Sequence, residues 1–360
     1  MSALRASIEL DDTEGLIAAD REGLLRAASS AGAQVRATAS AVAEGALDPL
    51  LSDQRPRSLI WVSGRGPAAT AGVMLAAALG GSAAEPIVVA AEAPPWIGPL
   101  DVLVVAGDDP GDPVLAAAAA TGVRRGSRVV IAAPYEGPLR DATGGRAAIL
   151  APRLWVPDDF GLSRYLAAGL ATLQAVDTAQ SVDLMALADE LDAEALRNSA
   201  SREVFTNGAK ALAARIAGRS VVLTGDCAAT LALARHAAVV LLRIAQQAVA
   251  AAGLADALVA LRSHPSDGYG GYDSAESLFH DEELDGPLPD RMRVLALTLA
   301  AERQVVAARA AGFADVDLVG VEDVPDPASA PVDSGRPEQQ LALLAVRLEM
   351  AAVYLQLARG

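Results

Sequence analysis

The sequence has little cysteine, few aromatic residues and a deficit of positive charge. Its single cysteine, Cys227, excludes an internal disulfide framework, and we interpret it as a small buried thiol. Basic residues number 29 against 45 acidic ones, which gives a formal net charge of −16. Such a charge repels a phosphate backbone and an anionic lipid surface, so we expect neither nucleic acid nor a membrane as the main partner.

The sequence also offers no candidate for a targeting segment or for a membrane span. The segment 1–12 contains no apolar stretch suited to a signal peptide. The longest uncharged run, 66–84, is rich in Ala and Gly and includes Gly80-Gly81, which favours a buried helix over a membrane span. We therefore expect a cytoplasmic protein. With 360 residues, of which 52% are hydrophobic, the chain can build one large core or two medium ones.

A strand–helix–strand pattern between Pro99 and Pro134 is the clearest local signal. A continuous apolar run at 102–106 fits a strand buried on both faces, and the Ala-rich segment 114–121 fits a crossover helix before the next strand, 128–133. Ligands of such a parallel sheet lie at the carboxyl ends of its strands. The acidic turn between the first strand and the helix therefore lies where a ligand is expected; its carboxylates are Asp108, Asp109 and Asp112.

Strands and helices alternate in the same way through both halves of the chain. Five strands between 59 and 151 predict a doubly wound α/β domain, and a second series begins at 220–224. Each half opens with an apolar strand that ends in Gly, which indicates a diverged structural repeat. In the second half we expect a long helix over 228–252 and a weak strand over 257–261.

These patterns predict an α/β protein with two domains. The expected parts are an N-terminal helical segment that packs on domain one (1–57), the first domain (58–177), a helical connector (178–200), and the second domain with a closing helix (201–360). Within the N-terminal segment the apolar periodicity predicts two helices, near 14–28 and 33–43.

Four segments carry a resemblance to a known family. The longest, 207–225, reads NGAKALAARIAGRSVVLTG and resembles the helix-then-strand entry into the second domain of bifunctional phosphoglucose/phosphomannose isomerases. Weaker matches are 162–169, the tetrapeptide 279–282 (FHDE) and the closing helix 341–360. They follow the family's order and cover most of the chain. The resemblance implies two tandem sugar-isomerase (SIS) domains, each a doubly wound parallel sheet, and a sugar derivative such as a hexose 6-phosphate as ligand, without a cofactor.

The resemblance also implies an activity. The family moves a proton between adjacent sugar carbons, which needs a carboxylate base, a ring-opening histidine and cations near the enediolate oxygens. It places His280 at the histidine position and Arg164 at the arginine position as catalytic residues. An exposed loop histidine and a surface or interdomain ion pair are the structural alternatives for these two residues.

The family binds phosphate in a Gly-rich turn after the first strand. The corresponding residues here predict the substrate-binding site; they are Ser63, Gly64, Arg65, Gly66 and Thr70. Ala68 stands where the family has a serine. The second turn of the family, also rich in hydroxyls, is replaced by the acidic turn, whose carboxylates repel a dianionic phosphate. A divalent cation there is conceivable; a solvated turn with Asp112 near a helix N-terminus is our expectation, so we predict no metal.

The family's catalytic glutamate is replaced. Its position aligns with Arg243, a cation that cannot accept a carbon-bound proton at neutral pH, and we assign this residue to substrate binding. Carboxylates that could substitute as the base are Glu203, Glu276 and Glu282. We therefore predict a sugar-phosphate-binding protein with impaired aldose–ketose isomerase activity. The alternative is an active glucose-6-phosphate/mannose-6-phosphate isomerase with a substituted base.

The helix that contains Arg243 is relevant to the oligomeric state. Its polar stripe, formed by His236, Val240, Arg243 and Gln247, predicts that this face meets a cleft or a dimer interface. The apolar faces of the Ala-rich helices 162–176 and 228–252 exceed what one sheet needs for cover, so we expect a homodimer.

A second alternative uses the same first turn. Gly64-Arg65-Gly66-Pro67-Ala68-Ala69 matches G-x-G-x-x-A between a strand and a helix, with Glu92 after the next strand as a partner for a ribose. This pattern is typical of nicotinamide-dinucleotide binding. Pro67 lacks the N–H that would face a pyrophosphate, which weakens the match.

Overall fold

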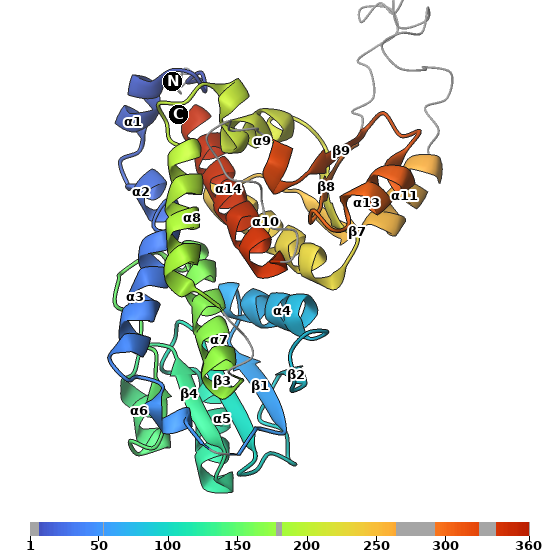
Figure 1. The fold of residues 1–360 in the computed structure, drawn as a ribbon. Coiled ribbons are helices and arrows are strands. Elements are labelled where there is room, and N and C mark those ends of the chain that lie inside the picture. Colours follow the sequence, from blue (N-terminus) through green and yellow to red (C-terminus); the bar gives the residue numbers. More distant parts are fainter. Residues whose placement is uncertain (1–6, 53, 178–181, 264–291, 324–335, 360) are drawn as a thin grey trace, which may run out of the picture.

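The chain is built on two separate sheets whose strands are all parallel (Figure 1). The computed structural model describes residues 7–52, 54–177, 182–263, 292–323 and 336–359. The first sheet has the order β2-β1-β3-β4-β5. Its strands are β1 (Ser58–Ser63), β2 (Ile87–Ala90), β3 (Asp101–Ala106), β4 (Arg128–Ala132) and β5 (Ala148–Ile149).

The second sheet repeats this arrangement with one strand fewer among the described residues. Its order is β7-β6-β8-β9, so β6 takes the place of β1 and β8 that of β3. The strands are β6 (Val221–Gly225), β7 (Ala250–Gly253), β8 (Arg293–Leu297) and β9 (Val316–Val319). The predicted α/β class with two parallel sheets is confirmed.

Helices cover both sheets and fill the space between them. Those of the first half are α1 (Thr13–Ala19), α2 (Leu24–Ala28), α3 (Ala31–Ala43), α4 (Pro67–Leu79), α5 (Pro113–Arg125), α6 (Gly137–Thr143) and α7 (Leu162–Val176). Those of the second half are α8 (Leu184–Arg197), α9 (Gly208–Ile216), α10 (Ala228–Ala245), α11 (Leu254–Ser263), α13 (Arg303–Ala310) and α14 (Pro337–Ala358).

Helix α14 is the centre of the core. It contacts α8, α9 and α10 and reaches α4 of the first half (Figure 1). One apolar cluster therefore runs from β1 and β3 through α4, α7 and α10 to β6 and β8. Among the described helices, α10 and α14 are long and apolar enough to cross a membrane by length and composition alone, but α14 is almost entirely buried inside the protein.

Helices α7 and α10 carry the apolar faces that motivated a dimer. In the structure α7 contacts α3 and α4, and α10 contacts α4, α14 and β6, so much of this surface is covered within one chain. The reason for the surplus is that each of these helices packs on α4 as well as on its own sheet. The homodimer stays a prediction, and so do the domain boundaries.

Three expected elements differ from the structure. The predicted helix over 14–28 is two helices, separated by a turn in which Gly23 has a φ of 68°. Helix α10 ends at Ala245, because Gln246 adopts the left-handed conformation with a φ of 49°, and β7 follows. The predicted strand 257–261 lies inside α11. The sequence does not predict strand β7, because Ala-Ala-Ala-Gly has a low intrinsic preference for a sheet.

Candidate functional site

The turn after β1 is open at the carboxyl end of the first sheet. Gly66 caps α4 with a φ of 73°, and a Cβ atom at this residue would meet nothing within 4 Å. Ser63 and Gly64 are half-buried, whereas Arg65 and Gly66 are exposed. The Thr70 hydroxyl donates a 3.4 Å hydrogen bond to the Gly66 carbonyl. The five predicted residues thus extend from the end of β1 to the first turn of α4, and the two between Gly64 and Pro67 are exposed.

The acidic turn after β3 lies beside it. The Gly64 N–H donates to the Ala106 carbonyl at 2.9 Å, and a Cβ atom on Gly64 would stand 3.6 Å from a carboxylate oxygen of Asp112. Asp112 caps α5 by accepting a 2.8 Å hydrogen bond from the Val114 N–H. Asp109 accepts one of 2.8 Å from the Gly111 N–H. Two of the three carboxylates therefore satisfy backbone donors.

The described residues contain no group of three or more His, Cys, Asp or Glu side chains that could hold a metal ion. At the acidic turn the reason is visible, since Asp109 and Asp112 are turned toward local backbone N–H groups. Asp108 has a different partner, described next.

Asp108 forms a carboxyl pair with Asp158, which belongs to the short 3-10 helix η2 (Asp158–Phe160). Desolvation and the hydrogen bond with Asp108 raise the pKa of Asp158, while the charge of Arg164 opposes that rise. Two adjacent carboxyl groups can share a hydrogen bond only if one of them holds a proton. The raised pKa therefore favours the protonated form of Asp158 more than an ordinary aspartate would.

Arg164 lies beside this pair, in the first turn of α7. Its guanidinium is 4.5 Å from the centre of the Tyr165 ring, and its Nη2 donates a 2.6 Å hydrogen bond to the Tyr165 hydroxyl. Burial raises the pKa of that phenol to about 12. The Arg164 Nε atom is buried and has no hydrogen-bond partner among the residues that the structure describes. The predicted arginine is thus placed next to carboxyl groups at the end of the first sheet.

Arg243 lies on the other side of η2. Its Nε atom is 2.9 Å from Oδ1 of Asp159, so this ion pair ties the end of α10 to the first half of the chain. The residue at the position implied for the base is therefore a cation held by a carboxylate.

The rest of the polar stripe on α10 faces inward. His236 Nε2 lies 2.9 Å from Oε1 of Glu349 on α14, and both side chains are buried. Burial raises the pKa of Glu349, and the charge of Asp159 adds to the rise. Gln247 accepts a hydrogen bond from Arg359. Contacts within the chain to α14 and η2 thus account for much of the stripe, and a cleft or dimer interface at the exposed part of this face stays a prediction.

The remaining predicted residues fall elsewhere. His280, Glu276 and Glu282 lie outside the described residues. Glu203 is exposed, and the neighbouring Val204 N–H is bonded to Asp11 of the N-terminal segment. Sequence patterns do not predict Asp158 and Asp159 as site residues. The only signal for them is an Asp-Asp pair after Pro157, directly before an apolar helix.

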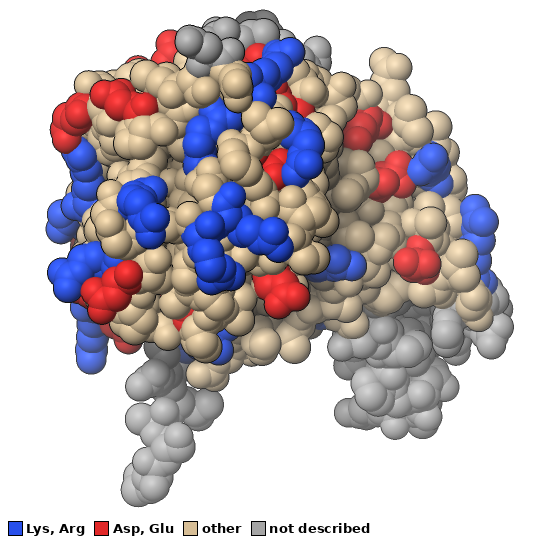
Figure 2. All heavy atoms as spheres, turned by 90° about the horizontal axis from the view of Figure 1, so that it is seen from below, with Lys and Arg blue, Asp and Glu red and all other residues tan. Residues whose placement is uncertain are grey.

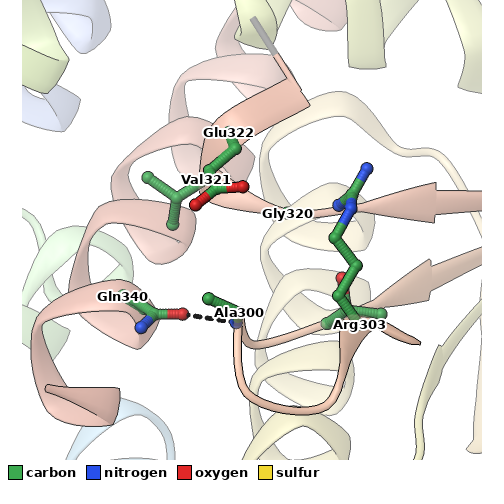
Figure 3. Close-up of a pocket in the computed structure, with 7 residues that line it drawn as sticks. Ala300, Arg303, Gly320, Val321, Glu322 and Gln340 are labelled. Atoms are coloured by element: carbon green, nitrogen blue, oxygen red, sulfur yellow. Dashed lines mark hydrogen bonds between the residues drawn. The ribbon is translucent and has the colours of Figure 1, made fainter. Parts of the chain in front are cut away.

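A small hollow lies at the carboxyl end of the second sheet, lined by described residues that follow β8 and β9 and by Gln340 of α14 (Figure 3). Its volume is about 10 Å³, enough for one water molecule. Arg303 and Gln340 lie on opposite sides of it, as Figure 3 shows. Arg303 is bonded to Asp323 at 2.8 Å, and Gln340 accepts a hydrogen bond of 2.8 Å from the Ala300 N–H. These groups mainly hold the loops together.

Comparisons with known proteins support the fold. No family profile and no curated protein sequence matches the chain. Solved structures do. A candidate phosphosugar isomerase from Silicibacter pomeroyi has 18% identity and a TM-score of 0.57, over 93% of this chain and 95% of that one. For tagatose-6-phosphate ketose/aldose isomerase from Escherichia coli the identity is 14% and the TM-score 0.56, over 96% and 95%.

A third match is a glucose-6-phosphate isomerase like protein from Thermus thermophilus, with 17% identity and a TM-score of 0.51, over 98% of this chain and 94% of that one. All three likenesses extend over nearly the whole of both chains. At these identities they establish the fold, which is the double-sheet arrangement of phosphosugar isomerases.

Proposed function

We propose that the protein binds a sugar phosphate or a related sugar derivative at the open turn after β1. We further propose that it is a diverged relative of bifunctional phosphoglucose/phosphomannose isomerases with impaired aldose–ketose isomerase activity. The observation that carries the second part is Arg243, which occupies the implied base position and is paired with Asp159 at 2.9 Å. An arginine stays protonated and cannot remove a proton from carbon.

The geometry of the two turns supports the position of the phosphate. The N-terminus of α5 is already capped by the Asp112 carboxylate, which occupies a donor and brings negative charge. The N-terminus of α4 has no side-chain cap, and the exposed Arg65 lies directly before its Gly66 cap. A helix N-terminus with an adjacent cation attracts an anion. The phosphate is therefore assigned to α4.

An active isomerase with a different base is the second candidate. The Asp108–Asp158 pair favours it, because a carboxyl group with a raised pKa beside an arginine is typical of acid–base sites. In that case Asp108 or Asp158 would move the proton, and Arg164 would stabilise the enediolate.

Calorimetry with fructose 6-phosphate tests the binding proposal. We expect the wild type to bind, and Arg65→Gln to weaken binding by about tenfold, as for a lost charge-assisted hydrogen bond. Arg26→Gln, at an exposed position on α2, is the matched control and should bind as the wild type does. A wild type that does not bind the sugar phosphate, or an Arg65→Gln variant that binds equally well, contradicts the proposal.

A further inference from the structure

The amino end of the first sheet is positively charged, although the chain carries a net charge of −16. Figure 2 shows this side of the molecule, where blue side chains gather over the half that holds the first sheet. The only lysine of the chain, Lys210, is fully buried, so the cations on this face are arginines. Arg55 and Arg57 precede β1, and Arg124 and Arg125 end α5, just before β4.

Two of these arginines hold the loop 91–100 in place. Arg57 donates a 3.2 Å hydrogen bond to the Trp96 carbonyl, and its guanidinium is 5.4 Å from the centre of the Trp96 ring. Arg125 donates one of 2.6 Å to the Pro95 carbonyl. Trp96 is 49% exposed and Leu100 is 47% exposed. We call the surface formed by Arg57, Trp96, Leu100 and Arg125 the arginine–tryptophan face.

The carboxylates that accompany these arginines are buried beneath them. Arg57 pairs with Asp101, which is fully buried, and Arg55 pairs with Glu85, which is 3% exposed. The arginine side chains themselves are 55% and 59% exposed. Within the described part of the chain, Arg124 and Arg125 form no ion pair; they donate to the Thr121 hydroxyl and the Pro95 carbonyl. The guanidinium groups are therefore exposed to solvent, whereas the carboxylates that pair with them are buried.

We propose that the arginine–tryptophan face binds an acidic segment of a partner protein. Guanidinium groups bind carboxylates through paired hydrogen bonds, and Arg125 has donors free for such a contact. Trp96 and Leu100 offer apolar area to an aliphatic side chain of the same segment. Tryptophan and arginine together are the residues that dominate binding energy in protein interfaces.

Two other occupants fit less well. A two-fold contact between copies of this chain on this face would bring like charges together. A nucleic acid needs a row of many cations along its phosphates, and among the four arginines named on this face only Arg124 and Arg125 form no ion pair with another described residue.

The test uses the intact protein and a short fluorescent peptide that repeats Glu-Glu-Leu. Matched probes are a peptide that repeats Gln-Gln-Leu and an oligothymidylate of similar length. Fluorescence anisotropy gives the affinity of each probe at low and at physiological salt. The protein variants are Arg125→Glu, Trp96→Ala and the control Arg26→Glu, which makes the same charge change on α2.

We expect the acidic peptide to bind at least about tenfold more tightly than the neutral peptide. Arg125→Glu should weaken it about fivefold or more, and Trp96→Ala by a similar or larger factor, whereas Arg26→Glu should have no effect. The absence of acidic-peptide binding, an unchanged affinity in Arg125→Glu, or tighter binding of the oligothymidylate would overturn the proposal. Arg57 is left intact because its loss would leave Asp101 buried without its partner.

Discussion

The carboxyl end of the first sheet is open, whereas the corresponding end of the second sheet is closed by its own helix. After β1 the chain turns through Gly66, where a Cβ atom would stand in free space. Strand β6 ends at Gly225, where a Cβ atom would stand 2.2 Å from the backbone nitrogen of Leu231 in α10. The same strand order therefore supports an accessible turn in one half and a packed one in the other.

This difference separates the two halves by role. The second half supplies α10 and α14, which pack on α4, and it supplies Arg243, which pairs with Asp159 of the first half. The first half supplies the open turn and the carboxyl pair Asp108–Asp158. The two copies of a structural repeat can thus keep the same strand order while one copy carries the accessible turn and the other packs against it.

The largest effect on stability is expected at the two glycines themselves. Gly225→Ala should lower the free energy of unfolding by about 3 kcal/mol, because the new methyl group meets backbone atoms of α10 that cannot move aside. Gly66→Ala should cost only about 1 to 2 kcal/mol, the strain of a side chain at a positive φ. Urea unfolding of both variants gives the values, and equal losses would remove the distinction between the turns.

A smaller effect is expected when the acidic turn is neutralised. Replacing Asp108, Asp109 and Asp112 by Ser, Gly and Thr should tighten the binding of fructose 6-phosphate by about tenfold, because three carboxylates no longer repel the phosphate. The Thr at 112 can still cap α5. Calorimetry on both forms measures the change. Weaker binding in the triple variant would show that these carboxylates serve the ligand.

The smallest effect concerns pH. Because the pKa of Asp158 is raised in the folded protein, its contribution to stability is complete below the ordinary carboxyl pKa and is lost as the pH rises through the raised value. Asp158→Asn should remove this part of the pH dependence and stabilise the protein at pH 7 by about 0.5 kcal/mol. Thermal unfolding between pH 4 and about pH 7 checks it, with Asp141→Asn as an exposed control. A steeper loss of stability with rising pH in Asp158→Asn would argue against a raised pKa of Asp158.

Much of the fold is predictable from the sequence because buried parallel strands have long apolar runs. The run from Val102 to Ala106 predicts a buried strand in this way, and all six residues of β3 are buried. Strand β7, made of Ala and Gly, has no such run, and α6 is a short helix of seven residues rich in polar groups. These two elements form through tertiary contacts, so local preference does not predict them.

The candidate site is less predictable. The turn after β1 is one continuous segment of the chain, so a sequence motif can predict its residues. The Asp108–Asp158 pair and the Arg243–Asp159 pair join residues far apart in the chain, and no local pattern brings them together. The sequence does predict that α10 has a polar stripe, but the partners of that stripe, Glu349 and Asp159, become known only from the packing.

Isomerase turnover tests the central claim most directly. Conversion of fructose 6-phosphate to glucose 6-phosphate, and separately to mannose 6-phosphate, is followed in a coupled assay on the wild type. We predict turnover that is absent or at least about a thousandfold below that of a competent enzyme, because Arg243 replaces the base. A trace should be gained in Arg243→Glu combined with Asp159→Asn, which removes the repulsion that the new carboxylate would meet. Wild-type turnover of about 1 to 10³ s⁻¹ that is lost in His280→Ala would contradict the account.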